Sequence, residues 1–448
     1  MPGRQNGRGV MAERMGVGIA GLGVVGASLV RLLAGSLGKT SSRTSAPAFD
    51  HLAMTGISAR TRGKDRGFDA RAYAWFDDPV ALATAPSTDI FVEVMGGAAG
   101  PALEAVTAAL EHGKHVVTAN KAMLADHGLM LARLAEEKGG SLSFEAAVAG
   151  AVPIIRTLKM TMAPCGVTSI IGILNGTCNY ILSEMETKGL EFEEALAEAQ
   201  EKGYAEADPT LDVGGGDAAQ KLKILAALCF HCWPSAFFES GDADPRVDGI
   251  TEISTAHIQY AKEFGFRIRL LGMAQPAPGI GTDPDLNLDL EVAPFLVSTD
   301  HGFAGTVGPE NRVVVAGTPL GTLGLSGPGA GGGPTASAVA ADLAALAHGP
   351  SPFTFGRAAA TLQTATLVPP PGSARQRVMI APAKAGDQAV SAMSLGDRLA
   401  DRRIAIDAAS SDRMAVVTAP ISRSTLDDAL ATLAEAGTPM SALRIADI

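Results

Sequence analysis

Short apolar runs and helical patterns alternate over the first third of the chain. One apolar run at residues 17–20 leads into a glycine turn and the helical pattern ASLVRLLAG, and another spans residues 51–58. Two more, at 89–97 and 114–122, each follow a helical pattern. This alternation of strand and helix predicts a parallel, doubly wound sheet in an α/β fold, which we place at residues 15–145.

The hydrophobic pattern changes beyond Glu145 and again near the C-terminus. β-Branched runs, long helical patterns and short alternating strands predict a mixed α/β domain at residues 146–323. A proline-rich linker is expected at 349–376, and residues 377–448 alternate as strand, helix, strand, strand, helix, strand, a ferredoxin-like order. The polar residues 1–14 are expected to form a disordered leader.

The first junction of strand and helix carries a dinucleotide-binding turn. The segment Gly21-Leu22-Gly23-Val24-Val25-Gly26 follows the first strand and opens a helix. Glycine lets the backbone turn tightly and approach a pyrophosphate, whose charge meets the helix N-terminus. The context predicts a Rossmann-type nucleotide domain, with a purely structural glycine turn as the alternative.

The tip of the second strand indicates which nicotinamide cofactor is used. An acidic residue there would bind the ribose hydroxyls of NAD(H), whereas a basic group would accept the 2′-phosphate of NADP(H). The tip, residues 60–66, carries Arg60, Arg62, Lys64 and Arg66, so NADP(H) is favoured and NAD(H) stays open. A solvated basic loop would give the same pattern, and Arg60 lies further from Gly26 than the usual distance of about 20 residues.

Only 12 of the 36 Lys and Arg side chains are lysines. Two of these lysines stand at positions where the reaction would need a group that can give up a proton. Lys121 ends an apolar run at the sheet edge where doubly wound folds bind ligands. Lys221 follows Asp217 by four residues, so the two share a helix face. Burial or a neighbouring cation would lower the pKa of either lysine and suit it to proton donation. The alternatives are a helix-start lysine and a surface ion pair worth about 0.3–0.5 kcal/mol.

Composition and charge exclude several classes of protein. A formal charge of −11 and a pI near 5.3 argue against nucleic-acid binding. No uncharged apolar stretch of about 20 residues exists, so a membrane span is not expected. Four bunched cysteines cannot form a secreted disulfide framework, and the leader lacks the apolar core of a signal peptide. A cytoplasmic location is expected.

Seven sequence blocks resemble the homoserine dehydrogenase family, occur in family order and are spread over roughly residues 15–345. The blocks are GLGVVG (21–26), VEVMGG (92–97), GKHVVTANK (113–121), FEAAVAGAVPII (144–155), ILNGTCNYIL (173–182), GYAEADPTLDVGGGDAAQKLKIL (203–225) and GPGAGGGPTASAVAADL (327–343). The resemblance implies reduction of L-aspartate 4-semialdehyde to L-homoserine with NAD(P)H, on the route to threonine, methionine and isoleucine. Two alternatives stay open: a cofactor-binding regulatory homologue without catalysis, and a related amino-acid or semialdehyde dehydrogenase.

The resemblance also implies roles for individual residues. Lys221 would donate the proton to the carbonyl oxygen as hydride arrives from the nicotinamide, with Lys121 touching both cofactor and substrate. Residues 324–348 would complete the nucleotide domain, since Gly331 would close over the cofactor. The implied substrate-binding residues are Gly203, Glu206, Asp212 and Asp217. The implied cofactor-binding residues are Gly21, Gly23, Val24, Val25, Gly26, Arg60, Arg62, Lys64, Gly97, Thr118, Lys121 and Gly331.

A monovalent cation site is implied by the same resemblance. Glu145 and the backbone carbonyls of Val148, Gly150 and Val152 would bind Na⁺ through hard oxygen ligands. The alternative is a buried carboxylate that holds a loop in place.

The resemblance further implies that residues 377–448 form an ACT-like regulatory domain with L-threonine as effector. The usual Asp-x-Pro-Gly turn is replaced by Pro382-Ala383-Lys384-Ala385-Gly386-Asp387. Threonine inhibition is therefore expected to be weak or altered. A homodimer or homotetramer is the expected assembly. The CxxC at Cys229 and Cys232 lacks the second pair that a zinc site needs, and we set it aside.

Overall fold

The computed structural model describes residues 14–37, 49–238, 244–277, 287–368, 375–383, 395–400, 404–412, 414–435, 440–446 and 448. These residues divide into two compact units. Unit 1 comprises residues 1–147 and 331–360, and unit 2 comprises 148–330 and 361–448, in each case within the described ranges. Almost all of the expected leader, and most of the turn at 382–387, lie outside the described residues.

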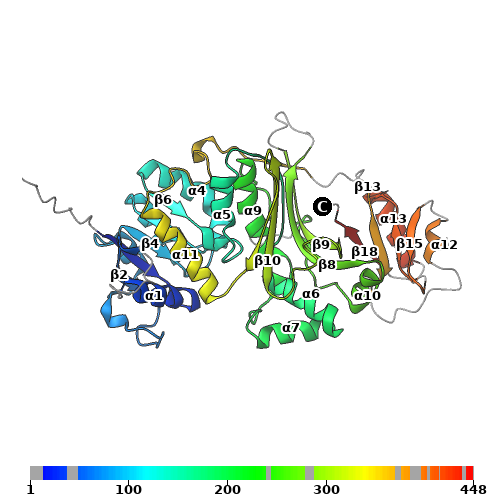
Figure 1. The fold of residues 1–448 in the computed structure, drawn as a ribbon, viewed down its shortest axis with the longest axis horizontal. Helices are drawn as coiled ribbons and strands as arrows, with labels where there is room; N and C mark the ends of the chain where they lie inside the picture. The colour runs from blue at the N-terminus through cyan, green and yellow to red at the C-terminus, as the bar shows by residue number, and fades with distance from the viewer. Residues whose placement is uncertain are drawn as a thin grey trace, which may run out of the picture. The chain divides into compact units, whose positions relative to one another are not determined.

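Unit 1 is built on a six-stranded sheet in the order β3-β2-β1-β4-β5-β6, in which every pair is parallel (Figure 1). The order reverses between β1 and β4, which is the topological switch point of a doubly wound sheet. The predicted fold class is thereby confirmed. The strands are β1 Met15–Ala20, β2 Leu52–Ser58, β3 Ala74–Phe76, β4 Ile90–Glu93, β5 His115–Thr118 and β6 Ser141–Ser143.

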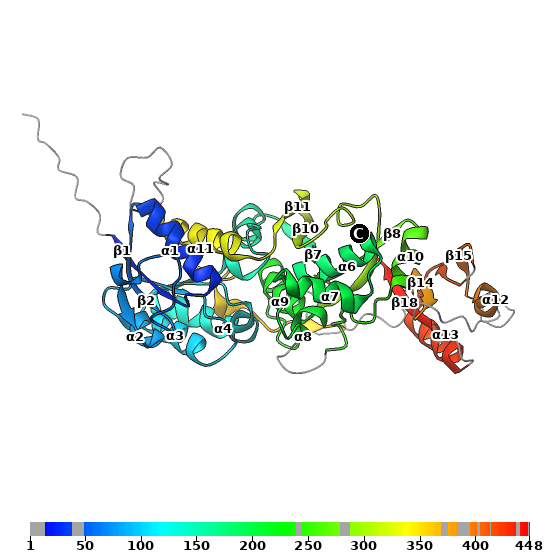
Figure 2. The same ribbon diagram turned by 90° about the horizontal axis from the view of Figure 1, so that it is seen from below.

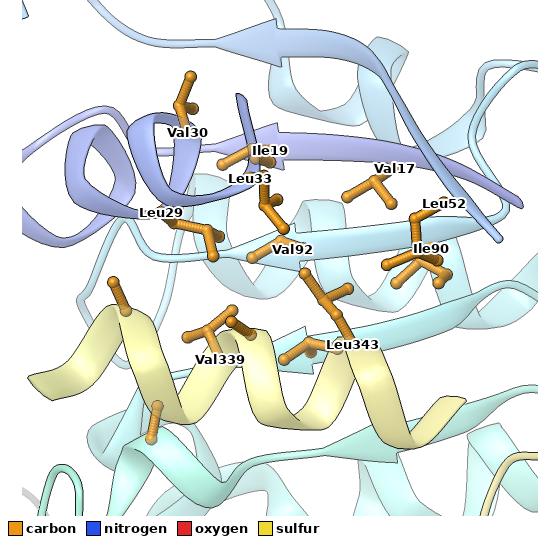
Figure 3. Close-up of a cluster of buried hydrophobic side chains, with 14 of the residues drawn as sticks. Val17, Ile19, Leu29, Val30, Leu33, Leu52, Ile90, Val92, Val339 and Leu343 are labelled. Carbon is orange, nitrogen blue, oxygen red and sulfur yellow. The ribbon is translucent and has the colours of Figure 1, made fainter. Parts of the chain in front are cut away.

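Two helices far apart in the sequence bury apolar side chains together in unit 1. Leu29 and Leu33 of the first helix pack in one cluster with Val339 and Leu343 of the last helix of the unit, beside strand residues such as Val92 (Figure 3). These side chains are 0–1% exposed. The helices and turns of the unit are α1 Val24–Leu37, η2 Ala70–Ala72, α2 Pro79–Thr84, α3 Pro101–Glu111, α4 Lys121–Lys138, η3 Glu145–Ala147 and α11 Gly332–Leu346.

Unit 2 contains a ten-stranded sheet in the order β11-β10-β7-β8-β9-β18-β14-β16-β15 with β12 paired to β9. The strands are β7 Gly166–Ile173, β8 Phe266–Pro276, β9 Asn287–Ser298, β10 Glu310–Thr318, β11 Gly321–Pro328, β12 Thr366–Leu367, β14 Val378–Pro382, β15 Ile406–Ala409, β16 Val416–Thr418 and β18 Met440–Ile445. A separate short pair joins β13 Arg375–Gln376 to β17 Ile421–Ser422.

The longest buried helix of unit 2 lies against this sheet. Helix α9, Gly216–Phe230, contacts β7, β8 and β9, and its residues 216–229 are all buried. The other helices of the unit are α5 Ile154–Arg156, η4 Thr157–Thr161, α6 Gly176–Lys188, α7 Phe192–Glu201, α8 Thr210–Val213, α10 Thr255–Glu263, α12 Leu395–Ala400 and α13 Arg423–Glu435, and η6 Ala359–Thr361 lies where the chain passes from unit 1 to unit 2.

The C-terminal strands have the order β18-β14-β16-β15, and each neighbouring pair is antiparallel. With α12 and α13 as the connecting helices, this is the split βαβ topology of a ferredoxin-like domain (Figure 2). Strand β18 also pairs in parallel with β9, at Arg444 with Phe295 and Ile445 with Leu296. The C-terminal strands therefore extend the sheet of the preceding domain. Within the described ranges, no helix combines the length and the apolar character that a bilayer span requires.

Candidate active site

The glycine turn has the backbone geometry that a pyrophosphate requires. Gly21 adopts φ +95°, and a Cβ there would lie 2.5 Å from the Val94 carbonyl oxygen. A Cβ on Gly26 would lie 1.9 Å from the Gly21 carbonyl oxygen, whereas one on Gly23 would meet nothing within 4 Å. Gly21 and Gly26 are thus required by packing, and Gly23 faces open space at the N-terminus of α1. This arrangement fits a dinucleotide phosphate.

Helix α11 begins beside the same turn. A Cβ on Gly332 would lie 2.7 Å from Val24 Cγ1, so the N-termini of α1 and α11 are neighbours. Gly331 is the N-cap residue of α11, with φ +118°, and is exposed. Val24 is also 76% exposed. The two glycine-rich segments therefore form one surface of unit 1.

The basic loop after β2 is held by Arg66, which the sequence pattern placed in the basic tip but which bonds the backbone instead. Arg66 is 9% exposed, and its guanidinium donates to the backbone carbonyls of Leu22, Lys64 and Thr61. It also lies 5.7 Å from the ring centroid of Trp75. Leu22 belongs to the glycine turn, so Arg66 joins that turn to the loop carrying Arg60, Arg62 and Lys64, which are themselves exposed.

A buried carboxylate organises the carboxyl ends of β4 and β5. Glu93 is fully buried; its carboxylate accepts hydrogen bonds from the backbone N–H groups of Met95 (2.7 Å) and Gly96 (3.0 Å) and from the Thr118 hydroxyl (2.6 Å). Asn120 caps α4 and donates to the Gly97 carbonyl at 2.8 Å. Thr118 and Gly97 thus belong to one network at the edge where such sheets bind ligands.

Lys121 directly follows this network as the first residue of α4. The cap by Asn120, whose side chain accepts from the Met123 N–H at 3.1 Å, fixes the start of the helix that carries it. Lys121 is partly buried. The structure therefore places it at the carboxyl end of β5, in the position that its sequence pattern predicted.

In unit 2, Lys221 and Asp217 form a buried ion pair on α9. Lys221 Nζ donates to Asp217 Oδ2 at 2.8 Å and to the Leu174 carbonyl at 2.7 Å. The side chains are 11% and 6% exposed, so the pair is not the surface ion pair of the alternative interpretation. The neighbouring Lys223 donates instead to the Ser235 carbonyl at 3.2 Å. Of the two lysines, Lys221 is the one that bonds Asp217.

The amide of Asn175 joins Asp217 to Asp212. Its Nδ2 donates to Asp217 Oδ2 at 2.7 Å and to Asp212 Oδ1 at 2.8 Å. Its Oδ1 accepts from the Cys178 N–H at 2.7 Å and so caps α6. Burial raises the pKa of the Cys178 thiol well above its ordinary value, with the Asp212 and Asp217 charges adding to the effect. Cys178 therefore stays protonated near neutral pH.

Gly203 and Glu206 lie on the exposed loop between α7 and α8. Gly203 adopts φ +73°, the left-handed conformation that favours glycine. The loop is held by Gln200, which donates to the Glu206 carbonyl at 3.0 Å, and by the Tyr204 ring, 4.9 Å from that of Tyr180. The same unit thus contains Gly203 and Glu206 on an open loop, Asp212 partly buried, and Asp217 and Lys221 buried.

The four residues of the implied cation site lie on both sides of the unit boundary. Glu145 opens η3 in unit 1, is 3% exposed, and donates through its N–H to Asp342 Oδ2 at 2.8 Å. Val148, Gly150 and Val152 open unit 2 and are buried. Gly150 has φ +57°, and a Cβ there would lie 2.5 Å from the Gly329 carbonyl oxygen. Buried carbonyls and a buried carboxylate are the donor types that a hard cation prefers.

The CxxC segment has no feature of a reactive site. Burial raises the pKa of Cys232 to about 11 and that of Cys229 further still, so neither thiol ionises near neutral pH. In the part of the chain that the structure describes, no group of three or more His, Cys, Asp and Glu side chains is arranged to bind a metal.

A nucleotide turn in one unit and a buried lysine–carboxylate pair in the other define a class, the NAD(P)-dependent oxidoreductases. Comparison with known proteins identifies the family. The family model "Homoserine dehydrogenase, NAD binding domain" matches residues 21–145, and the model "Homoserine dehydrogenase" matches residues 153–344. The chain belongs to the homoserine dehydrogenase family, enzymes that interconvert L-aspartate 4-semialdehyde and L-homoserine with a nicotinamide cofactor.

Curated relatives and solved structures agree with this assignment. Homoserine dehydrogenase of Synechocystis sp. is 40% identical over 327 residues, 73% of this chain and 72% of that protein. The Mycobacterium tuberculosis enzyme is 42% identical over 335 residues, 75% and 72% of the two chains. A homoserine dehydrogenase structure from Thiobacillus denitrificans has a TM-score of 0.82 at 32% identity and covers 97% of this chain and 99% of its own. A hyperthermophilic archaeal homoserine dehydrogenase in complex with NADPH has a TM-score of 0.58 at 25% identity, covering 74% and 98%.

Sequence reasoning missed the residues that hold the site in place. Glu93 and Asn175 were given no role, and Arg66 was counted in the basic tip for the 2′-phosphate although its guanidinium bonds backbone carbonyls. The only available signals were a third arginine in the basic loop, a carboxylate inside an apolar strand, and an asparagine before a helix. None of these shows which partner the side chain will meet.

Proposed function

We propose that Lys221 is the proton donor and that Asp217, with Asp212 in support, binds substrate in this homoserine dehydrogenase. The buried pair of Lys221 Nζ and Asp217 Oδ2 at 2.8 Å carries the proposal. Taking both charges out of water is costly unless they are paired and hydrogen-bonded, and here the Leu174 carbonyl and the Asn175 amide supply those bonds. Such an arrangement suits a site that handles a proton.

The reaction needs one hydride and one proton. A bound nicotinamide cofactor would supply the hydride that the aldehyde carbon of L-aspartate 4-semialdehyde accepts. Lys221 holds a proton at Nζ and gives it to the carbonyl oxygen, so the C=O double bond becomes the alcohol of L-homoserine. In the reverse direction the neutral lysine takes the hydroxyl proton. Gly203 and Glu206 on the open loop would bind the amino-acid end of the substrate, and Lys121 would contact cofactor and substrate.

NADP(H) is the favoured cofactor, with NAD(H) open. Support comes from the exposed basic groups Arg60, Arg62 and Lys64 and from the buried Arg66 that fixes their loop to the glycine turn. The archaeal relative named above was solved with NADPH. The backbone at Gly21, Gly23, Val24, Val25 and Gly26 would hold the pyrophosphate. Gly97, Thr118 and Gly331 would complete the cofactor site.

A monovalent cation, Na⁺ by preference, is proposed at Glu145 and the carbonyls of Val148, Gly150 and Val152. The buried carboxylate of Glu145 and the left-handed backbone at Gly150 support it. The cation would stiffen the segment that joins the two units in sequence. We also propose a homodimer or homotetramer, which light scattering on the purified chain would test.

The C-terminal domain is proposed to be ACT-like, with weak or altered response to L-threonine. A cavity of about 210 Å³ lies where this domain extends the sheet of unit 2. Its lining includes Arg246, Asp248 and Arg423, so positively and negatively charged side chains are available to bind the carboxylate and ammonium groups of an amino acid. Activity measured with and without millimolar L-threonine tests the proposal. We expect little inhibition, and strong inhibition at low concentration would contradict it.

The central test is NADP-dependent oxidation of L-homoserine, followed at 340 nm. Wild type should be active in the presence of Na⁺ or K⁺, and Lys221→Ala should lose activity by about 100-fold or more, in line with loss of a general acid–base group. A panel of other amino-acid alcohols and semialdehydes should give lower efficiency. An inactive wild type would favour the regulatory homologue instead.

A further inference from the structure

Asn175 makes three hydrogen bonds with one side chain at the start of α6. Its Nδ2 donates to Asp212 Oδ1 and Asp217 Oδ2, and its Oδ1 accepts from the Cys178 N–H. The residue is 2% exposed. An amide nitrogen has two hydrogens, so both are used on two carboxylates. The Oδ1 bond is an ordinary helix cap, but the two Nδ2 bonds do nothing for the helix.

The two Nδ2 bonds oppose a repulsion that the fold would otherwise contain. Both carboxylate oxygens lie within 2.8 Å of one nitrogen, so they are at most about 5.5 Å apart. Two carboxylates at this distance, one of them 4% exposed, repel and favour protonation of one of the pair. Lys221 Nζ bonds the same Oδ2 of Asp217 that Asn175 bonds. The position of that oxygen therefore depends on the amide as well as on the lysine.

We propose that Asn175 is a positioning residue for the Lys221–Asp217 pair. Its amide holds Asp212 and Asp217 together in their charged forms and so sets the direction in which Lys221 Nζ points. The inference rests on the proposed roles of Lys221 and Asp217. The facing titratable groups are Asp212 from α8, Asp217 and Lys221 from α9, and the Cys178 thiol, which stays protonated near neutral pH.

The substitution Asn175→Ser distinguishes the helix-capping role of Asn175 from its two hydrogen bonds to Asp212 and Asp217. Serine is also a good N-cap residue, so its hydroxyl would keep the bond from Cys178 N–H. It is too short and has too few hydrogens to bridge both carboxylates. We expect kcat/KM for L-homoserine to fall by 10- to 100-fold, while KM for NADP⁺ and the melting temperature stay near wild type. The acid limb of the pH profile should move to higher pH, because one carboxylate would take up a proton more readily.

Asn175→Asp keeps the shape and the cap acceptor but places a third carboxylate against the pair. It should lower kcat/KM more than Asn175→Ser and move the acid limb further. It also carries the test if the serine variant does not fold. As a matched control, Asp78→Ser exchanges the N-cap residue of α2, whose carboxylate accepts from the Val80 N–H at 2.9 Å, and should leave all kinetic constants unchanged.

Two parallel variants keep the inference separate from the proposed function. If Lys221→Ala and Asp217→Asn lose activity while folded Asn175→Ser or Asn175→Asp keeps the wild-type kcat/KM and pH profile, Asn175 is a cap only and the inference fails. If Lys221→Ala and Asp217→Asn are both active, the proposed function fails, and the positioning role fails with it. Loss of activity in Asn175→Ser with an unmoved acid limb would also overturn the role given to the amide.

Discussion

At the scale of single residues, Arg66 shows how a charged side chain in a basic loop can be structural. Its guanidinium donates hydrogen bonds to three backbone carbonyls, one of which is that of Leu22 inside the glycine turn. The guanidinium also lies over the Trp75 ring. Arginine is suited to this because its planar fork presents several donors at once. Arg60 is exposed, which is consistent with its proposed contact with the 2′-phosphate of the cofactor.

Exchanges at Arg60 and Arg66 should therefore differ. Arg60→Ala should lower the ratio of NADPH to NADH efficiency by about 10-fold or more, since a charge-assisted bond to the 2′-phosphate is lost. Arg66→Met should weaken the binding of both NADPH and NADH, because the glycine turn would no longer be hydrogen-bonded to the basic loop. It should also lower the melting temperature. Steady-state kinetics with each cofactor and thermal melts check this. An unchanged ratio in Arg60→Ala would contradict the NADP assignment.

At the scale of elements, the turn between β1 and α1 combines glycines with opposite constraints. Gly26 is packed against the Gly21 carbonyl, whereas Gly23 faces open space. The sequence motif marks both alike. Only the packing shows that Gly26 is required by the fold, and the open space at Gly23 supports its proposed role beside the cofactor.

Alanine at the two positions should separate fold from binding. Gly26→Ala would bring Cβ to 1.9 Å from a backbone oxygen and should lower the free energy of unfolding by several kcal/mol as well as abolish cofactor binding. Gly23→Ala should leave unfolding without cofactor close to wild type but raise KM for NADP⁺ by at least 10-fold. Urea unfolding and NADPH fluorescence titration measure the two effects. Equal cofactor affinity in Gly23→Ala and wild type would contradict this role for the turn.

At the scale of the whole molecule, unit 2 joins its C-terminal domain through a continuous sheet and through helix α10. His257 of α10 is 2% exposed, accepts at Nδ1 from the Ser254 N–H, and hydrogen-bonds Ser441 of β18 through Nε2. Tyr260 of α10 donates to Asp412 at 2.7 Å. Burial lowers the pKa of His257 to about 4.

This histidine should make the protein acid-labile. His257 binds a proton with a pKa near 6.5 in the unfolded state and only near 4 in the folded state. The contribution of neutral His257 to the free energy of unfolding is therefore complete above pH 6.5 and is lost as pH falls toward 4. The loss amounts to at most about 3 kcal/mol. His257→Gln cannot titrate and should show a smaller decline in unfolding free energy between pH 6.5 and 4.5. Parallel declines in the two proteins would rule out a contribution from His257.

Much of this architecture could be predicted from sequence. Alternation of apolar runs and helices gave the parallel sheet, and Gly21, Gly23 and Gly26 in context gave the nucleotide turn. The i,i+4 spacing of Asp217 and Lys221 predicted one helix face, and burial then confirmed a pair. The contacts of Asn175 with residues 37 and 42 positions away, or of Arg66 with Leu22, depend on tertiary packing, which local patterns do not encode.

The most direct test of the account is the rate of NADP-dependent L-homoserine oxidation by the full chain, wild type against Lys221→Ala, with both proteins shown to bind NADPH equally. We predict an active wild type and a loss of about 100-fold or more in kcat for the variant, with cofactor affinity unchanged. A Lys221→Ala protein that retains wild-type kcat would contradict the assignment of Lys221 as proton donor.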